Sequence, residues 1–306
     1  MKKTYLNIFF QIVALTLIVK VLFFDEVEYD KLSLLKTDQL ILLIMFSIII
    51  KLLVTFLFFN ILNIFSTKKL RYSDVNLIHL QGGLINNILP GVGYAFRYYK
   101  LKLYLNIDIL KYSVSQIIFS LTLLLVYFSA AAILGFLIIA SYVNLVFFVI
   151  IISISLIFTF QFRYKLYNII KKILLRNKNT SFLVNDLKNI KKLLSKNKKI
   201  FFLIFIGFII FIILECYSFY LGLKFLGMEI SFFNSNYIFI TTTLLTALTF
   251  INFFGKFELI LVLSAAIIVP DISYVLIFAV NLRIINLFSL ILLIIKSSVL
   301  KKILDK

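Results

Sequence analysis

The chain has 306 residues, of which 62% are hydrophobic and 15% are charged, and its formal net charge is +19. Soluble domains carry about 25% charged residues, so the composition excludes an ordinary soluble protein. The single cysteine and the single histidine exclude an intramolecular disulfide and a multi-histidine metal site. Several apolar runs reach the ~20 residues that a helix needs to cross a bilayer. We therefore predict an all-α, polytopic membrane protein that uses no metal or cofactor.

Apolar runs divide the chain into spanning and interrupted segments. The runs predicted to span the membrane are, in chain order, Asn7–Phe24, Gln39–Ile64, Ser113–Ala140, Asn144–Phe160, Ile200–Leu223 and Val275–Ile295. Two more apolar regions, Val75–Phe96 and Phe232–Val269, are interrupted by glycine or polar residues. Lipid cannot satisfy the backbone of an interrupted helix, so each interruption requires a protein or aqueous environment. The first run lacks a small-residue cleavage site, so we expect an uncleaved helix.

Basic residues in the loops predict the orientation. Of the 32 lysines and arginines, 12 lie between Gln161 and Lys199 against the single acid Asp186, which is typical of a cytoplasmic loop. The basic N-terminus and the basic tail are also predicted to be cytoplasmic, and the acidic segment Asp25–Asp30 to lie outside. Because topology accounts for this charge, we expect no nucleic-acid partner. The sequence predicts a bacterial inner-membrane protein with both termini in the cytoplasm.

This orientation makes both interrupted regions re-entrant. Val75–Phe96 lies between two basic segments, so it would enter and leave on the cytoplasmic side, whereas Phe232–Val269 would start and end outside. A spanning helix, a re-entrant pair and a second spanning helix then occur twice with opposite orientation, a recurrent design of transporters. The single membrane domain would comprise an N-terminal helix and outer loop (1–38), a first repeat (39–140), a linking helix (141–160), a basic loop (161–199), a second repeat (200–295) and a tail (296–306).

Charged residues inside apolar segments mark a predicted site, because each costs at least ~2.5 kcal/mol on insertion scales. They are Lys51, Arg97, Glu215, Lys256, Glu258 and Arg283. This surplus of cations suits a phosphate-bearing group, and the N-termini of half-helices would add partial positive charge. Glu215 and Arg283 could form a structural ion pair, or the carboxylate could orient Arg283 toward a bound anion. Lys51 could instead snorkel or pack against polar neighbours. His79 is expected to be a polar residue at the interface, with a role in the site as the alternative.

Two motifs resemble those of a known membrane family. The first is N-x-x-P-G-x-G-x-x-x-R, formed by Asn87, Pro90, Gly91, Gly93 and Arg97. The second is a G-x-x-E element, a helix of small residues and a later arginine, formed by Gly255, Lys256, Glu258, Ser264–Ala266 and Arg283. In this order they resemble the lysylphosphatidylglycerol synthetase transmembrane-region family, also called flippase-like. The sequence departs from the family pattern at Tyr94, where an acid is frequent, and at Asn252–Phe254, where Pro-Gly-Gly is frequent.

The resemblance implies a membrane region that translocates a lipid. The best-understood members of the family also carry a separate cytoplasmic C-terminal domain that attaches an amino acid to the lipid. Here the sequence ends eleven residues after the last predicted helix, so we expect no aminoacyl-transferase domain and no lysyl transfer. Stand-alone members are associated with cell-surface glycan or glycolipid pathways.

The function predicted is binding and translocation of an anionic lipid, either a phospholipid or a polyprenyl-phosphate glycolipid, by a transporter rather than an enzyme. The predicted substrate-binding residues are Asn87, Pro90, Gly91, Gly93, Arg97, Glu215, Gly255, Lys256, Glu258 and Arg283. Partners would be membrane lipids with an anionic headgroup, and either a second copy or an enzyme of the same pathway. The alternative is an integral-membrane glycosyltransferase or its accessory subunit, using the carboxylates of Asp25–Asp30. A scaffold that presents the basic loop would leave the interrupted motifs unexplained.

Overall fold

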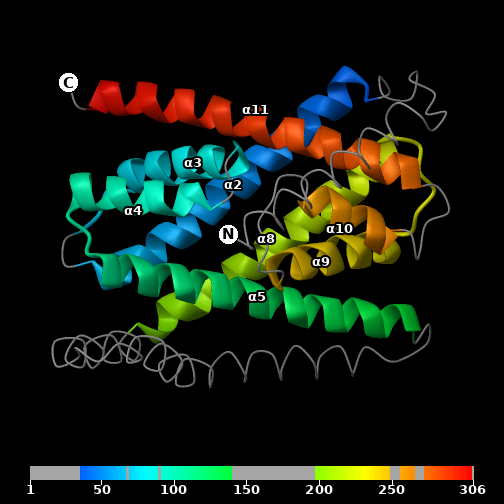
Figure 1. The fold of residues 1–306 in the computed structure, drawn as a ribbon, viewed down its shortest axis with the longest axis horizontal. Helices are drawn as coiled ribbons and strands as arrows, with labels where there is room; N and C mark the ends of the chain where they lie inside the picture. Colours follow the sequence, from blue (N-terminus) through cyan, green and yellow to red (C-terminus); the bar gives the residue numbers. More distant parts are fainter. Residues whose placement is uncertain are drawn as a thin grey trace, which may run out of the picture.

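The computed structural model describes residues 35–66, 69–88, 91–139, 197–248, 256–265 and 272–304, and within these ranges all regular structure is helical. The helices are α2 (Thr37–Phe65), α3 (Tyr72–Ile88), α4 (Val92–Leu105), α5 (Ile109–Ile139), α8 (Lys198–Phe225), α9 (Phe232–Leu248), α10 (Lys256–Ala265) and α11 (Ile272–Leu304) (Figure 1). The predicted spans Asn7–Phe24 and Asn144–Phe160, the acidic segment Asp25–Asp30 and most of the basic loop lie outside the described residues.

Four of the described helices, α2, α5, α8 and α11, are long and apolar enough to cross a membrane. The shortest of the four apolar stretches, Ile277–Val299, has 23 residues, which corresponds to about 34 Å of helix. These stretches confirm the predicted spans that start at Gln39, Ser113, Ile200 and Val275. The described part of the chain therefore has the all-α architecture of a helical membrane protein.

The interruption predicted in the first region is present, because α3 ends at Ile88, Gly91 is in a turn and α4 begins at Val92. In the second region α9 covers Phe232–Leu248 and α10 covers Lys256–Ala265, and residues 249–255 between them lie outside the described residues. The first region extends further than predicted, because α4 continues beyond Phe96 to Leu105. Leu101 is buried in the core and keeps this basic segment helical, and Asn106 ends the helix in a left-handed conformation with φ 52°.

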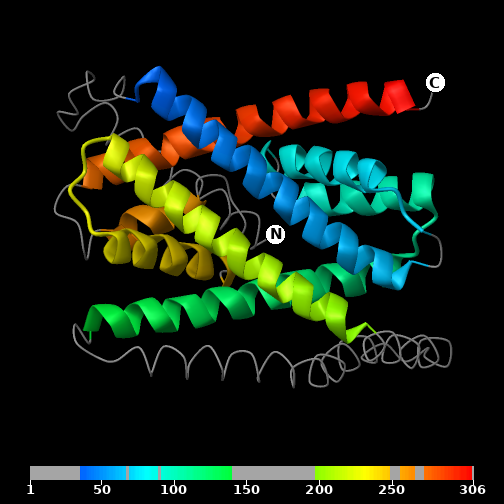
Figure 2. The same ribbon diagram turned by 180° about the vertical axis from the view of Figure 1, so that it is seen from behind.

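Each half of the described chain arranges its helices in the same way. Helix α3 packs against α4 and α11, and correspondingly α9 packs against α10 and α5, while α2 packs against α8 between the halves. In Figure 1 the α3–α4 pair lies in the left half and the α9–α10 pair in the right half. Figure 2 shows α2 and α8 side by side, with the colour order running in opposite directions. Residues 37–139 and residues 198–304 thus each contribute four described helices with corresponding contacts.

Glycines permit the close approach of the central helices. A Cβ on Gly207 of α8 would lie 2.4 Å from Leu57 Cδ2 of α2, and a Cβ on Gly222 would lie 2.0 Å from the Phe278 ring of α11. Phe219 packs against that same ring with centroids 5.3 Å apart. Small residues that let large side chains nest against a neighbouring backbone are typical of helix contacts in membranes. These contacts fix α8 between α2 and α11, and the polar side chains of all three helices face one cavity.

Candidate functional site

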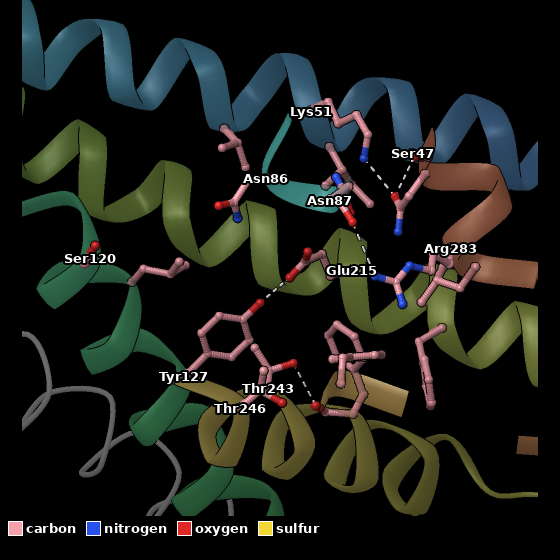
Figure 3. A pocket seen from close by; sticks show the side chains of 18 of the residues that line it. Ser47, Lys51, Asn86, Asn87, Ser120, Tyr127, Glu215, Thr243, Thr246 and Arg283 are labelled. Atoms are coloured by element: carbon pink, nitrogen blue, oxygen red, sulfur yellow. Dashed lines mark hydrogen bonds between the residues drawn. The ribbon is translucent and has the colours of Figure 1, made fainter. Parts of the chain in front are cut away.

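A cavity of about 970 Å³ lies between the two sets of helices. Its wall is apolar where Leu43, Phe119 and Phe239 contribute, and polar elsewhere. The polar and charged residues that line it are Ser47, Lys51, His79, Asn86, Asn87, Tyr94, Arg97, Gln116, Ser120, Tyr127, Glu215, Ser218, Thr243, Thr246, Arg283 and Asn286, several of them drawn in Figure 3. A polar cavity inside a bundle of apolar helices is expected only where a polar ligand or water enters.

Lys51 of α2 is held in the cavity by an amide of α11. Its Nζ donates a hydrogen bond of 2.8 Å to Asn286 Oδ1, and Ser47 Oγ donates to the same oxygen at 3.0 Å. The ammonium is therefore aimed at a neutral acceptor instead of snorkelling toward an interface (Figure 3). A neutral amide oxygen orients the charge of Lys51 but does not neutralise it.

The α3–α4 hairpin is built by glycine contacts. A Cβ on Gly93 would lie 2.1 Å from the carbonyl oxygen of Gly82, so the two helices touch backbone to backbone at this point. The turn ends at Gly91, whose φ of +91° favours glycine, and the backbone N–H of Gly91 donates to Asn86 Oδ1 at 2.7 Å. Asn87 Nδ2 donates to the carbonyl of Gly83 at 3.0 Å, which anchors the last turn of α3.

Arg97 of α4 lies across Gly82 of α3. A Cβ on Gly82 would lie 2.3 Å from Arg97 Cγ and 2.6 Å from its Nε, so the absence of a side chain there makes room for the arginine. The guanidinium stands over the Tyr94 ring at 5.5 Å from the centroid. Its Nε is buried and has no hydrogen-bond partner among the described residues. Burial lowers the pKa of Arg97, but a guanidinium remains protonated at any physiological pH.

Glu215 and Arg283 form hydrogen bonds with other residues. Tyr127 of α5 donates a hydrogen bond to Glu215 Oε2, and Arg283 Nη2 donates to the backbone carbonyl of Asn87 at 3.4 Å (Figure 3). Arg283 therefore links α11 to the end of α3, at the turn of the hairpin. Both residues face the cavity, and the carboxylate is oriented by a tyrosine hydroxyl instead of by an arginine.

His79 is not at an interface, as the sequence had led us to expect, but is buried on the cavity wall with 9% of its surface exposed. Its ring packs against Phe58 with centroids 4.9 Å apart, and its Nδ1 has no hydrogen-bond partner among the described residues. Burial lowers the pKa of His79, and the positive charge of Arg97 lowers it further. His79 is therefore neutral, because α3 places it inside the helix bundle and beside a cation.

The residues predicted from the motifs are found in different places. Asn87, Gly91, Arg97, Glu215 and Arg283 line the cavity. Gly93 packs between α3 and α4, while Pro90 and Gly255 lie outside the described residues. Lys256 and Glu258 are in the first turn of α10, and their side chains are not described.

Sequence reasoning missed several cavity residues, namely Asn86, Gln116, Tyr127 and Asn286. An amide inside a predicted span, such as Gln116 in α5 or Asn286 in α11, was the available signal, because burying an amide in hydrocarbon also costs free energy. Apart from the motif residues, only charged side chains inside apolar segments had been considered. Gln116 Oε1 is buried without a hydrogen-bond partner in the described structure, as is Arg97 Nε.

The electrostatics of the cavity favour an anion. Three cations, Lys51, Arg97 and Arg283, and one carboxylate, Glu215, line it among the described residues. The ion pair found in the described part of the chain joins Lys111 to Asp108 and lies away from the cavity. The described lining residues thus carry more cations than carboxylates, and because burying net positive charge is costly, an anionic ligand would lower the energy of this arrangement. Within the described residues no group of three or more His, Cys, Asp or Glu could hold a metal ion.

Comparisons with protein-family models, with curated proteins and with solved structures find nothing that matches this chain.

Proposed function

We propose that the protein binds the phosphate-bearing headgroup of an anionic lipid in this cavity and moves it between the two leaflets of a bacterial inner membrane. The observation that carries the proposal is the hydrogen bonding of two cations in the cavity. Within the described part of the chain, Arg97 Nε is buried without a hydrogen-bond partner, and Lys51 has a neutral amide as its hydrogen-bond partner. Arginine and lysine together recognise phosphate oxygens through short, charge-assisted hydrogen bonds.

The size and the walls of the cavity suit a lipid headgroup. Ligand sites commonly enclose about 300–1,000 Å³, and this one measures about 970 Å³. Apolar side chains of α2, α5 and α9 complete the wall, among them Leu43, Leu123 and Leu244. The headgroup would occupy the polar part while the acyl chains remain in the bilayer. The protein then needs to shield only the charged end of the lipid from hydrocarbon.

The matching helix sets supply a path between the leaflets. We infer that α3–α4 and α9–α10 are re-entrant pairs that start from opposite faces of the membrane, with the chain termini in the cytoplasm. Supporting this, the pairs lie in opposite halves of the molecule and their flanking helices run in opposite directions (Figures 1 and 2). Inverted sets of this kind let a site near the midplane open alternately to either side. The first motif that resembles the flippase-like family falls in the α3–α4 pair, while the second contributes Lys256 and Glu258 to α10 and Arg283 to α11.

A reconstitution assay tests the proposal. Liposomes of phosphatidylcholine would contain a trace of phosphatidylglycerol with a fluorescent acyl chain, and a membrane-impermeant quencher would report how fast outer-leaflet lipid is replaced. We expect the protein to accelerate the movement of phosphatidylglycerol. Arg97→Ala should reduce the rate at least about tenfold, because a charge-assisted hydrogen bond contributes about 1.5–3 kcal/mol.

The matched control is Lys102→Ala, which removes an exposed cation from the same helix. Its rate should equal that of the unmodified protein. An equal rate for all three proteins, or acceleration of fluorescent phosphatidylcholine to the same extent, would contradict the proposed headgroup site.

A further inference from the structure

We propose that Glu215 is a proton-binding site, and that the cavity takes up a proton together with the anionic headgroup. This inference rests on the proposed function and adds an ion to it. The protein would then move the phosphate-bearing group and a proton as one unit, so that a pH gradient across the membrane biases the direction of lipid movement.

The position of Glu215 is the first argument. It lies in the middle of α8, ten residues before Phe225 at the end of that helix, and it lines the same cavity as Lys51, Arg97 and Arg283. An acid inside a membrane-crossing helix costs free energy, and such residues are usually paired with another group or belong to a functional site. Its hydrogen-bond partner is Tyr127, a neutral group that is itself buried with 4% exposed surface.

The surroundings of Glu215 are the second argument. Helix α8 packs against α2, α5, α9 and α11. The side chains that line the same cavity from these helices include Lys51 of α2, Tyr127 of α5, Thr243 and Thr246 of α9, and Arg283 of α11, and the buried thiol of Cys216 is next to Glu215 on α8. His79, Tyr94 and Arg97 line the same cavity from α3 and α4. Lys51 is near enough to act on the carboxylate electrostatically.

The coupling follows from the charges. In the empty cavity the positive charge of Lys51 favours the ionised form of Glu215. When a phosphate group binds to the cations of the cavity, it neutralises them and places a second negative charge beside the carboxylate, which favours the protonated form. Binding of the anion therefore promotes binding of a proton, and by reciprocity a proton promotes binding of the anion. Tyr127 donates to Oε2, so the proton would reside on Oε1, and it would come from water that enters the cavity.

Titration calorimetry measures the coupling directly. The purified full-length protein in detergent would be titrated with dioctanoyl-phosphatidylglycerol at about pH 7, in two buffers that differ in their heat of ionisation. The difference between the binding heats gives the number of protons taken up per lipid bound. We expect uptake of up to about one proton for the unmodified protein and none for Glu215→Gln, whose amide oxygen can still accept from Tyr127.

Two further variants separate Glu215 from other titratable groups. Glu229→Gln makes the same chemical change at an exposed position beyond the end of α8, and its proton uptake should equal that of the unmodified protein. His79→Gln removes another titratable group of the cavity, and uptake should persist. Uptake lost in His79→Gln and retained in Glu215→Gln would assign the proton to His79 and overturn the inference.

The outcomes for the unmodified protein are distinct. Binding of the lipid without proton uptake would overturn the coupling and leave the proposed function intact, whereas no binding at all would remove both. Glycerol phosphate, tested alongside, identifies the source of the phosphate group. Proton uptake with this soluble compound as well as with the lipid still supports Glu215 as the proton site, and uptake with the lipid alone supports it for membrane ligands only.

Discussion

Replacing Gly82 with alanine should displace Arg97 and weaken binding of an anionic lipid without unfolding the protein. The new Cβ would lie 2.3 Å from Arg97 Cγ, about 1.1 Å short of the 3.4 Å at which ordinary contact begins. Cγ is the second carbon of the side chain, so rotation further along the arginine cannot relieve the collision. The whole side chain must change its χ1 rotamer, or α4 must move away from α3.

The magnitude follows from the contact that Arg97 would lose. A hydrogen bond to a charged group contributes about 1.5–3 kcal/mol, and 1.4 kcal/mol corresponds to a factor of ten in affinity. We therefore expect the dissociation constant for dioctanoyl-phosphatidylglycerol, measured by calorimetry in detergent, to rise roughly 10- to 100-fold. The free energy of unfolding should fall by no more than is typical of an overpacked core position, about 1–3 kcal/mol.

Gly83→Ala is the matched control on the adjacent residue of the same helix. Its Cβ would meet Leu290 Cδ2 at 3.6 Å and Arg97 Nη2 at 3.7 Å, both ordinary contacts. Alanine also favours helix by about 0.5–1 kcal/mol over glycine, so this variant should bind as well as the unmodified protein and be no less stable. If Gly82→Ala binds the lipid as tightly as Gly83→Ala does, Arg97 is not part of the anion site and the reasoning is refuted.

Three other changes test the same structure. Gly93→Ala places a Cβ 2.1 Å from the Gly82 carbonyl, and because a backbone oxygen cannot rotate away, the thermal midpoint should fall by more than in Gly82→Ala; an unchanged midpoint would disprove the backbone contact. Asn286→Ala removes the acceptor of Lys51, which should cost about 1–3 kcal/mol of stability, and Asn286→Asp should restore it; equal stability of both variants would count against that bond. His79 has a lowered pKa in the folded state, so unfolding takes up a proton below the unfolded pKa of about 6.5, and stability should fall as the pH decreases from about 7 to 5.5. His79→Gln should flatten this decline, by up to about 1.4 kcal/mol per pH unit, in thermal unfolding followed by circular dichroism. An identical slope in both proteins would show that His79 titrates alike in the folded and unfolded states and would contradict its neutral burial.

The sequence was sufficient to predict the four long helices and the break between α3 and α4. Runs of Ile, Leu, Phe and Val reach membrane length, and Gly91 marks the break in the first region with a positive φ. The end of α4 was harder to predict, because residues 97–105 carry several cations. Only the tertiary contact of Leu101 shows that one face of this basic segment is buried.

The partners of the charged residues could not be predicted from the sequence. Two charges on neighbouring helices, such as Glu215 and Arg283, can meet only if each lies on the face of its helix that points toward the other helix. When a helix is apolar on every side, the sequence does not indicate which face points inward. The structure turns Glu215 toward Tyr127 of α5 and Arg283 toward the carbonyl of Asn87. For the same reason the neutral burial of His79 depends on Phe58 and Arg97, which lie 21 and 18 residues away along the chain.

The central claim is that the guanidinium of Arg97 binds the phosphate of a lipid headgroup inside the cavity. Solid-state NMR of the protein in bilayers, with nitrogen-labelled arginine and bound dioctanoyl-phosphatidylglycerol, measures the distance from lipid phosphorus to guanidinium nitrogen. A direct contact predicts about 4 Å for the unmodified protein, since the charge-assisted hydrogen bond itself is about 2.7–2.9 Å long. The signal should be reduced in Arg97→Lys. Phosphorus that shows no coupling to arginine nitrogen in the saturated, unmodified protein would contradict the account.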